Sequence, residues 1–428
     1  MLANVCKLNT ESVKFLEKYL HKMEPHFIKG GKYEKWNPLF ETLATFAFTP
    51  KLVTTKGTHI RDGVDLKRTM FTVVIALIPC LIFGIYNTGH WEMAVAEGNR
   101  DIPYFAEMGA KFLMGLTIVL PVVVVSYGVG LTIEFVFGML RGHSLHEGFL
   151  VSGMLIPLCM PADVPLWMVA VATIFAVVIG KEVFGGTGMN ILNVALTARA
   201  FLFFAHPTKM SGNEVWVTGF SDLKGEKYSS LVSSANPEGV VDGSSGATAL
   251  GDLASFMQDS PVLENTQAFQ AKYSLMDSFL GFIPGSVGET SALMCLIGAA
   301  LLLWTGIASW RVIGSFFIGG FVMATILNLV GGNGYFELPA IHQLMLGGFM
   351  FGMVFMATDP VTAAHTNAGK FIYGFLGGFL GILIRMVNPA YPEGIMLAIL
   401  IANVFAPLID HMVIQNNINR RLKRLKTA

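Results

Sequence analysis

Apolar segments close to the length of a bilayer crossing recur along most of this chain, and they constrain its fold more than any other feature. A membrane-spanning helix needs about 20 consecutive, mainly apolar residues, and such runs recur between residues 69 and 411. Charged residues make up only 14% of the chain and hydrophobic residues 53%, which is typical of polytopic membrane proteins rather than soluble enzymes. The sequence therefore predicts an all-α polytopic membrane protein.

Hydropathy windows predict about ten transmembrane helices. Several of them are short or interrupted by Gly and Pro, which a bilayer tolerates only where protein or a cavity satisfies the freed backbone groups. The predicted spans are 69–87, 111–139, 149–161, 166–183, 190–205, 289–308, 312–330, 342–357, 371–387 and 394–411.

The distribution of charge predicts the orientation of these helices. Residues 1–68 hold twelve Lys and Arg, and residues 412–428 hold five. By the positive-inside rule, both termini are then cytoplasmic and the number of crossings is even. Residues 206–278 hold four Lys and no Arg against nine Asp and Glu, as expected of an external loop. The formal net charge of zero gives nucleic acid binding no electrostatic support.

We accordingly expect five regions along the chain. They are a cytoplasmic amphipathic segment (1–68), a first membrane half of five helices (69–205), a periplasmic loop (206–288), a second half of five helices (289–411) and a basic cytoplasmic tail (412–428).

The third and eighth predicted helices share a pattern that suggests internal duplication. One reads Gly-Phe, Gly-Met and Met-Pro in turn between 148 and 161, and the other reads Gly-Phe, Gly-Met, Met and Pro between 348 and 360. Five helices per half, an odd number, would give two inverted five-helix repeats, in which broken helices mark the functional site. Chance similarity between two helices rich in Gly, Met and Phe is the alternative.

A short run in the external loop has the pattern of an acceptor site. Residues 242–248 read Asp-Gly-Ser-Ser-Gly-Ala-Thr, with small residues next to the hydroxyl of Thr248. Small neighbours let another molecule approach that hydroxyl. Gly and Ser are also ordinary turn residues, so a simple turn is the alternative.

A second run, residues 180–193, joins the fourth and fifth predicted helices on the cytoplasmic side. Its glycines, Gly185, Gly186 and Gly188, permit close backbone approach. Asn190 and Asn193 are three residues apart and are predicted to share one face of the next helix, where both amides can hydrogen-bond. The alternative is glycine-mediated helix packing with asparagine caps.

Three carboxylates in or beside apolar spans are candidates for an ion path, because a carboxylate inside a membrane is costly and usually functional. They are Glu134, Asp359 and Asp410, of which Glu134 is the most deeply placed in its span. Turn chemistry before Pro360 is the alternative for Asp359. Interfacial snorkelling beside the basic tail is the alternative for Asp410.

The N-terminal segment is rich in lysine and interleaves aromatic residues such as Trp36. Such a stretch usually lies on the membrane surface, or it could line an opening for a lipid-soluble substrate. The chain has no Walker A, Rossmann or zinc motif, and its four cysteines show no metal-ligand spacing. We therefore expect neither a bound metal nor an iron–sulfur cluster.

Taken together, the motifs resemble the B subunit of the bacterial sodium-translocating NADH:quinone reductases. The resemblance rests on the run 242–248, the Gly-Lys-Glu-Val-Phe-Gly-Gly-Thr-Gly segment at 180–188, Ala-Thr-Asp-Pro at 357–360 and Asn-Pro-Ala-Tyr-Pro-Glu-Gly at 388–394. Gly-Gly-Lys-Tyr-Glu-Lys-Trp at 30–36 also matches. The resemblance as a whole covers nearly the whole chain.

This resemblance implies a component of an ion-pumping respiratory enzyme in the bacterial inner membrane, working with five other subunits and with ubiquinone. It also implies FMN bound to Thr248 through a phosphoester, which a flavin transferase attaches within the pattern formed by Asp242, Ser245, Gly246 and Ala247. A noncovalent riboflavin is implied at the segment with Gly185, Gly186, Gly188, Asn190 and Asn193. The quinone region of the family maps onto Trp36, Glu41 and Gly130.

The expected activity is electron transfer from FMN to riboflavin and then to quinone, coupled to sodium export along Glu134, Asp359 and Asp410. Two departures from the family bear on local detail. Val194 stands where proline is common, so a softer helix break is expected, and the stretch 224–241 is longer than expected. The rival functions are the homologous D subunit of the ion-translocating ferredoxin:NAD reductases and a flavin-free secondary transporter.

Overall fold

The computed structural model describes residues 18–20, 22–27, 31–33, 36–37, 40–42, 44, 54–58, 66–96, 103–141, 148–210, 248–256, 262–331, 334–387 and 394–427. These residues are mostly helical and contain no strand. Six of their helices are long and apolar enough to cross a bilayer, which agrees with a polytopic membrane protein. The count of ten crossings and the cytoplasmic location of both termini stay predictions.

The helices fall into two groups, with a layer of shorter helices between them in the chain. The first group is α3 (Leu66–Ala96), α4 (Met108–Arg141), α5 (Gly148–Leu158), α6 (Leu166–Gly180) and α7 (Val194–Ala205). The layer contains α8 (Pro207–Met210), α10 (Ala249–Phe256), α11 (Val262–Lys272) and α12 (Leu275–Leu280). The second group is α13 (Ala292–Trp304), α14 (Trp310–Val330), α15 (Gly334–Glu337), α16 (Ala340–Met345), α17 (Phe349–Phe351), the π-helix η4 (Gly352–Met356), α18 (Asn367–Val387) and α19 (Gly394–Thr427).

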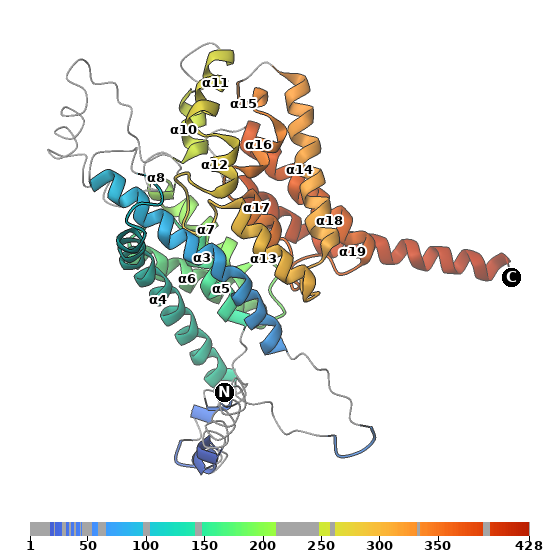
Figure 1. Ribbon diagram of the computed structural model, residues 1–428. Coiled ribbons are helices and arrows are strands. Elements are labelled where there is room, and N and C mark those ends of the chain that lie inside the picture. Colours follow the sequence, from blue (N-terminus) through green and yellow to red (C-terminus); the bar gives the residue numbers. More distant parts are fainter. Residues whose placement is uncertain are drawn as a thin grey trace, which may run out of the picture.

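The two groups lie side by side, with the blue-to-green helices next to the gold-to-red ones (Figure 1). Helix α3 packs on α13, and α7 contacts α19, so both pairs join the groups. Within the groups, α6 packs on α4 and α7, and α18 packs on α14 and α19. The two inverted five-helix repeats stay a prediction.

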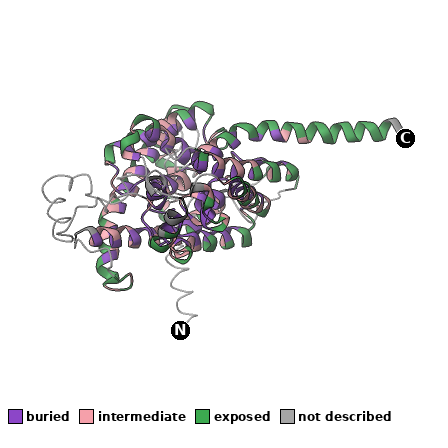
Figure 2. Cartoon of the chain, turned by 90° about the horizontal axis from the view of Figure 1, so that it is seen from above, coloured by how far each residue is buried: buried purple, intermediate pink, exposed green. Residues whose placement is uncertain are grey.

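Glycines let the helices of each group approach to backbone contact. A Cβ on Gly115 of α4 would overlap the carbonyl of Ile85 in α3, and a Cβ on Gly378 of α18 would overlap that of Phe316 in α14. Small residues at such crossings are the usual means of close packing between membrane helices. Buried residues fill the interior of both groups, and exposed ones cover the outside (Figure 2).

Two predicted helices differ from the structure because their backbones are interrupted. The predicted helix 342–357 is three short pieces, broken where Gly347 adopts a φ of 60°. The predicted helix 190–205 begins only at Val194, because Asn193 is its N-cap and accepts a hydrogen bond from the Leu196 N–H at 3.2 Å. The expectation that Asn190 and Asn193 share a helix face is therefore wrong, and Val194 does not prevent the break.

The last helix is longer than predicted. The predicted span ends at 411, but α19 continues to Thr427. Residues 412–427 contain neither Gly nor Pro and are rich in Leu, Arg and Lys, which favour helix, so nothing stops the helix where the apolar run ends.

Candidate functional site

Thr248 caps α10. Its hydroxyl oxygen accepts a hydrogen bond from the Gly251 N–H at 2.9 Å, and its carbonyl accepts one from the Asp252 N–H at 2.8 Å. Asp252 in turn accepts a hydrogen bond from the Tyr273 hydroxyl at 2.6 Å, which fixes α10 to the end of α11. Asp242, Ser245, Gly246 and Ala247 lie outside the described residues.

A cavity opens beside this capping threonine. Its volume, counted to the open mouth, is about 410 Å³. The wall is built by the start of α10, the loop before α13 and the break between α16 and α17. The lining residues are Thr248, Ala249, Leu250, Ile283, Pro284, Gly285, Ser286, Glu289, Thr290, Gly347 and Gly348.

A buried ion pair adjoins this cavity through Glu289, which is one of its lining residues. The Arg199 guanidinium lies 2.6 Å from Oε1 of Glu289, and their side chains are only 2% and 9% exposed. The Ser286 hydroxyl donates to the other Glu289 oxygen at 2.6 Å. A further cavity of about 280 Å³ shares Glu289 and Gly348 with the first and also contacts Arg385. Glu289 therefore borders both hollow regions, and Arg199 lines the second.

At the opposite ends of the helices, Asn190, Asn193 and Asp359 line one cleft. Its volume, counted to the open mouth, is about 790 Å³, and Val151, Leu302 and Phe355 supply apolar walls. The Asn193 amide lies 3.4 Å from Oδ2 of Asp359. The fold therefore joins two features that are separate in the sequence.

Asp359 is held by several donors at the end of the broken helix. The Val361 N–H donates to it at 3.0 Å and the Thr362 hydroxyl at 3.2 Å. Loss of solvent nevertheless raises the pKa of the Asp359 carboxyl, and the hydrogen bonds from Val361, Thr362 and Asn193 oppose this shift. A cation in the cleft would stabilise the ionised form.

The three glycines of the run 180–193 act through the backbone. Gly185, Gly186 and Gly188 have φ values of 121°, 94° and 90°, a region that residues with a Cβ rarely adopt. They do not line the cleft, whereas Thr187 between them does. The buried hydroxyl of Thr187 has no hydrogen-bond partner, so it is available to a molecule bound there.

Glu134 is paired with a lysine of the same run. Its carboxylate is hydrogen-bonded to the Lys181 ammonium, and both side chains are buried. Lys181 lines the cleft, but Glu134 does not. Beside them, Arg141 pairs with Glu182 at 2.9 Å.

Asp410 holds the start of α18. Its carboxylate accepts hydrogen bonds from the His365 N–H at 2.6 Å, and from the Thr366 N–H at 3.0 Å and hydroxyl at 2.5 Å. Acceptors before a helix satisfy its unpaired N–H groups. Asp410 therefore acts as a structural cap and does not line the cleft.

The described part of the N-terminal segment contacts α4. The rings of Trp36 and Phe135 lie 5.2 Å apart between centroids. Gly130, five residues earlier in α4, packs against the Phe149 ring of α5. Glu41 is exposed in the same segment.

Comparison with known proteins identifies the family. A family model described as NQR2, RnfD, RnfE matches residues 53–419. The chain belongs to the NQR2, RnfD, RnfE family. A relative from Chromohalobacter salexigens is 47% identical and aligned over 95% of both chains. Relatives from Stutzerimonas stutzeri and Ectopseudomonas mendocina are 45% and 46% identical, over 95% of this chain and 98% of theirs. All three are named as the B subunit of a Na(+)-translocating NADH-quinone reductase.

Sequence reasoning missed several buried charges in this member of the NQR2, RnfD, RnfE family. Arg199 and Arg385 are fully buried inside helices, and Lys181 and Glu289 line cavities. The sequence does contain a signal for them, because a charged residue inside an apolar span indicates function or pairing. That signal holds for arginine and lysine as well as for the carboxylates within the spans.

Proposed function

We propose that this chain is the membrane-embedded B subunit of a sodium-translocating NADH:quinone reductase. In this proposal it carries FMN on Thr248 and a noncovalent riboflavin at the cytoplasmic cleft. It works in the bacterial inner membrane with five other subunits, and a flavin transferase matures it. The names and the identity of its relatives over nearly their whole length support this function. The observation that carries the flavin assignment is one cavity at the Thr248 hydroxyl and one cleft at Asn190 and Asn193.

The surroundings of Thr248 suit a phosphate ester. The hydroxyl caps the first turn of α10, where free N–H groups and the helix dipole favour negative charge. The adjoining cavity has apolar surface from Leu250 and Ile283 and polar groups from Ser286 and Thr290. Such a mixture suits a ring system with a polar edge.

The cytoplasmic cleft suits a second, neutral flavin. Its apolar walls could contact the faces of the ring, while the Thr187 hydroxyl and the amides of Asn190 and Asn193 could bond its polar edge. When bound, the two flavins supply the electron transfer. The protein fixes their positions and excludes water around them.

Sodium is the proposed cargo, and Asp359 is its best-supported ligand. Its carboxylate faces the cleft beside the Asn193 amide, and oxygen ligands are the ones a hard cation prefers. Glu134 is proposed to act through Lys181, because the lysine lines the cleft and would respond to a nearby cation. Asp410 stays in the proposal as the residue that positions the segment after Asp359.

The quinone region is proposed at Trp36, Glu41 and Gly130. The contact between Trp36 and Phe135 supports it, because it brings an aromatic side chain of the N-terminal segment against α4. Quinone is lipid-soluble, so a site between a surface segment and a membrane helix is reachable from the bilayer.

The family model also names RnfD, so a D subunit of a ferredoxin:NAD reductase is the second candidate. The purified complex should oxidise NADH with quinone and show stimulation by sodium. Asp359→Asn and Glu134→Gln should weaken that stimulation while NADH is still oxidised. Oxidation of ferredoxin instead of reduction of quinone would favour the second candidate. Unchanged sodium dependence in both variants would remove the two carboxylates from the ion path.

A further inference from the structure

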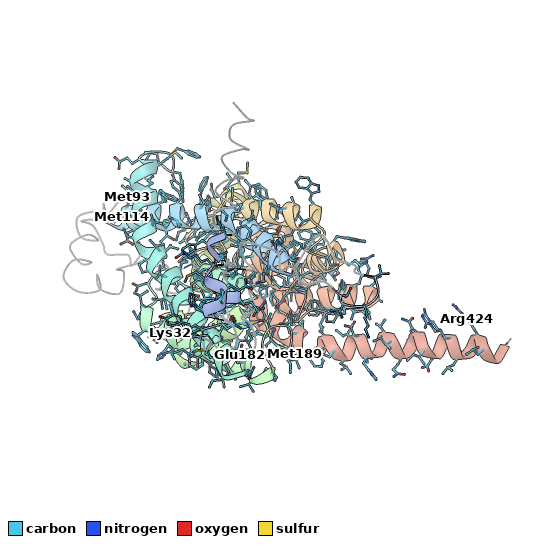
Figure 3. All side chains as sticks on the ribbon, turned by 90° about the horizontal axis from the view of Figure 1, so that it is seen from below. Lys32, Met93, Met114, Glu182, Met189 and Arg424 are labelled. Carbon is cyan, nitrogen blue, oxygen red and sulfur yellow. The ribbon has the colours of Figure 1, made fainter. Side chains whose placement is uncertain are left out.

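The end of α19 extends beyond the length that a bilayer needs. The helix has 34 residues, whereas about 20 residues span the hydrocarbon core, so about 14 remain (34 − 20). We call residues 412–427, the part of α19 that follows the predicted membrane span, the terminal extension. Figures 1 and 2 show it projecting away from the other described helices, and Figure 3 shows Arg424 far from the bundle.

The terminal extension is amphipathic. Ile414, Ile418, Leu422 and Leu425 follow one another at intervals of four, four and three residues, so they form one stripe along the helix. They are between 42% and 74% exposed. This apolar stripe therefore lacks a covering within the described chain.

The remaining surface of the extension is polar and basic. It contains no Asp or Glu, and its charged residues are Arg420, Arg421, Lys423, Arg424 and Lys426. On a helical projection these residues lie outside the apolar stripe, because successive residues turn by about 100°. An apolar stripe flanked only by positive charge is the pattern of a helix that lies in the boundary of an anionic bilayer.

We propose that the terminal extension is a membrane-surface anchor, with its apolar stripe in the headgroup boundary and its basic residues on lipid phosphates. The extension is the end of a helix that is long and apolar enough to cross a bilayer, so a bilayer surface would be the first apolar surface within its reach. Pro407 lies inside the helix just before it and removes a backbone hydrogen bond, which permits a bend there. A protein groove would need matching acidic residues, whereas anionic phospholipid supplies that charge directly. The proposal does not depend on which cofactors the protein holds.

Spin-label accessibility in the complete complex tests this anchor. One cysteine at a time is introduced into a Cys6→Ser background, either by Ile418→Cys on the stripe or by Asn416→Cys as the matched control. Two residues apart on a helix, these positions face nearly opposite directions. The complex is placed in nanodiscs of phosphatidylcholine, with or without about one third phosphatidylglycerol. We then measure how often the spin label collides with oxygen, which concentrates in lipid, and with a water-soluble nickel chelate. The parent complex, treated in the same way, shows how much label attaches to its other cysteines.

The expected result is a higher oxygen-to-nickel collision ratio at 418 than at 416, with a larger contrast when phosphatidylglycerol is present. Combining Arg420→Gln, Arg421→Gln and Arg424→Gln should reduce that contrast. Equal access of the nickel chelate to both positions would overturn the proposal, because the extension would then lie in water. Protection of position 418 from both reagents would also overturn it, because protein would then cover the stripe. A contrast that is the same without anionic lipid would refute the electrostatic part.

Discussion

Replacing Gly130 by alanine is expected to disturb the contact between α4 and α5, and Gly128 provides a matched control on the same helix. A Cβ at Gly130 would come within 2.7 Å of Cε2 of Phe149 and closer still to two other ring atoms, whereas a Cβ at Gly128 would have no atom within 4 Å. Phe149 is fully buried, so its ring has little room to move. Overpacking of this kind costs about 1–3 kcal/mol. Alanine at an exposed helical glycine gains up to about 1 kcal/mol from helix propensity.

The two substitutions should therefore shift stability in opposite directions. The assay is the apparent melting temperature of the purified complex in detergent, followed by loss of the monodisperse species. Gly130→Ala should melt below the parent and Gly128→Ala at or above it. Gly130→Ala should also raise the KM for quinone, because Gly130 belongs to the proposed quinone region and its neighbour Phe149 would be displaced. Equal melting temperatures for the two variants would refute the packing argument.

Three further predictions concern buried groups. Arg199→Met should destabilise the complex by about 3–5 kcal/mol because it leaves Glu289 buried without its cation. Adding Glu289→Gln should recover stability. A double variant that melts no higher than Arg199→Met would contradict this. Burial raises the pKa of Asp359, so its ionisation opposes folding once the pH exceeds the ordinary value for Asp. In sodium-free buffer, Asp359→Asn should therefore melt above the parent at neutral pH, and the difference should shrink as the pH falls toward that value; a difference independent of pH would argue against it. A membrane-permeable oxidant should form a disulfide between Cys80 and Cys295, whose sulfur atoms lie 3.9 Å apart. Non-reducing peptide mapping that finds no such disulfide would contradict the packing of α3 on α13.

Long membrane helices could be predicted because their signal is local. The expected spans 166–183 and 312–330 correspond closely to α6 (Leu166–Gly180) and α14 (Trp310–Val330). Apolarity sustained over the thickness of a bilayer leaves the backbone few alternatives to helix. The ends of helices were less predictable. In α19 the polar residues beyond the apolar run also favour helix, so the end of the apolar run does not mark the end of the helix.

The positions at which helices are interrupted could not be predicted from the sequence, because tertiary contacts determine them. The segment 190–193 leaves the helix where Asn193 caps α7 and contacts Asp359, which is 166 residues away in the chain. Likewise, Gly347 breaks the predicted eighth helix where its backbone passes Leu250 and Arg385. Hydropathy windows contain no information about such partners.

The candidate site was accessible from sequence only in parts. Asn193 and Asp359 each stand out in the sequence, but nothing there indicates that one cleft holds both. Glu134 stands out as an isolated carboxylate, and the structure adds its partner Lys181. The pairing of Arg199 with Glu289 depends on how the two groups of helices dock, and docking is a property of the whole fold.

Whether Thr248 carries FMN can be decided by mass spectrometry of the peptide that contains residue 248, from chain matured together with its complex. This peptide is expected to carry the added mass of one FMN on the Thr248 hydroxyl. The added mass and the in-gel flavin fluorescence should both disappear in Thr248→Ala while the complex still assembles. An unmodified Thr248 peptide from active complex would contradict the account, as would flavin fluorescence that survives the substitution.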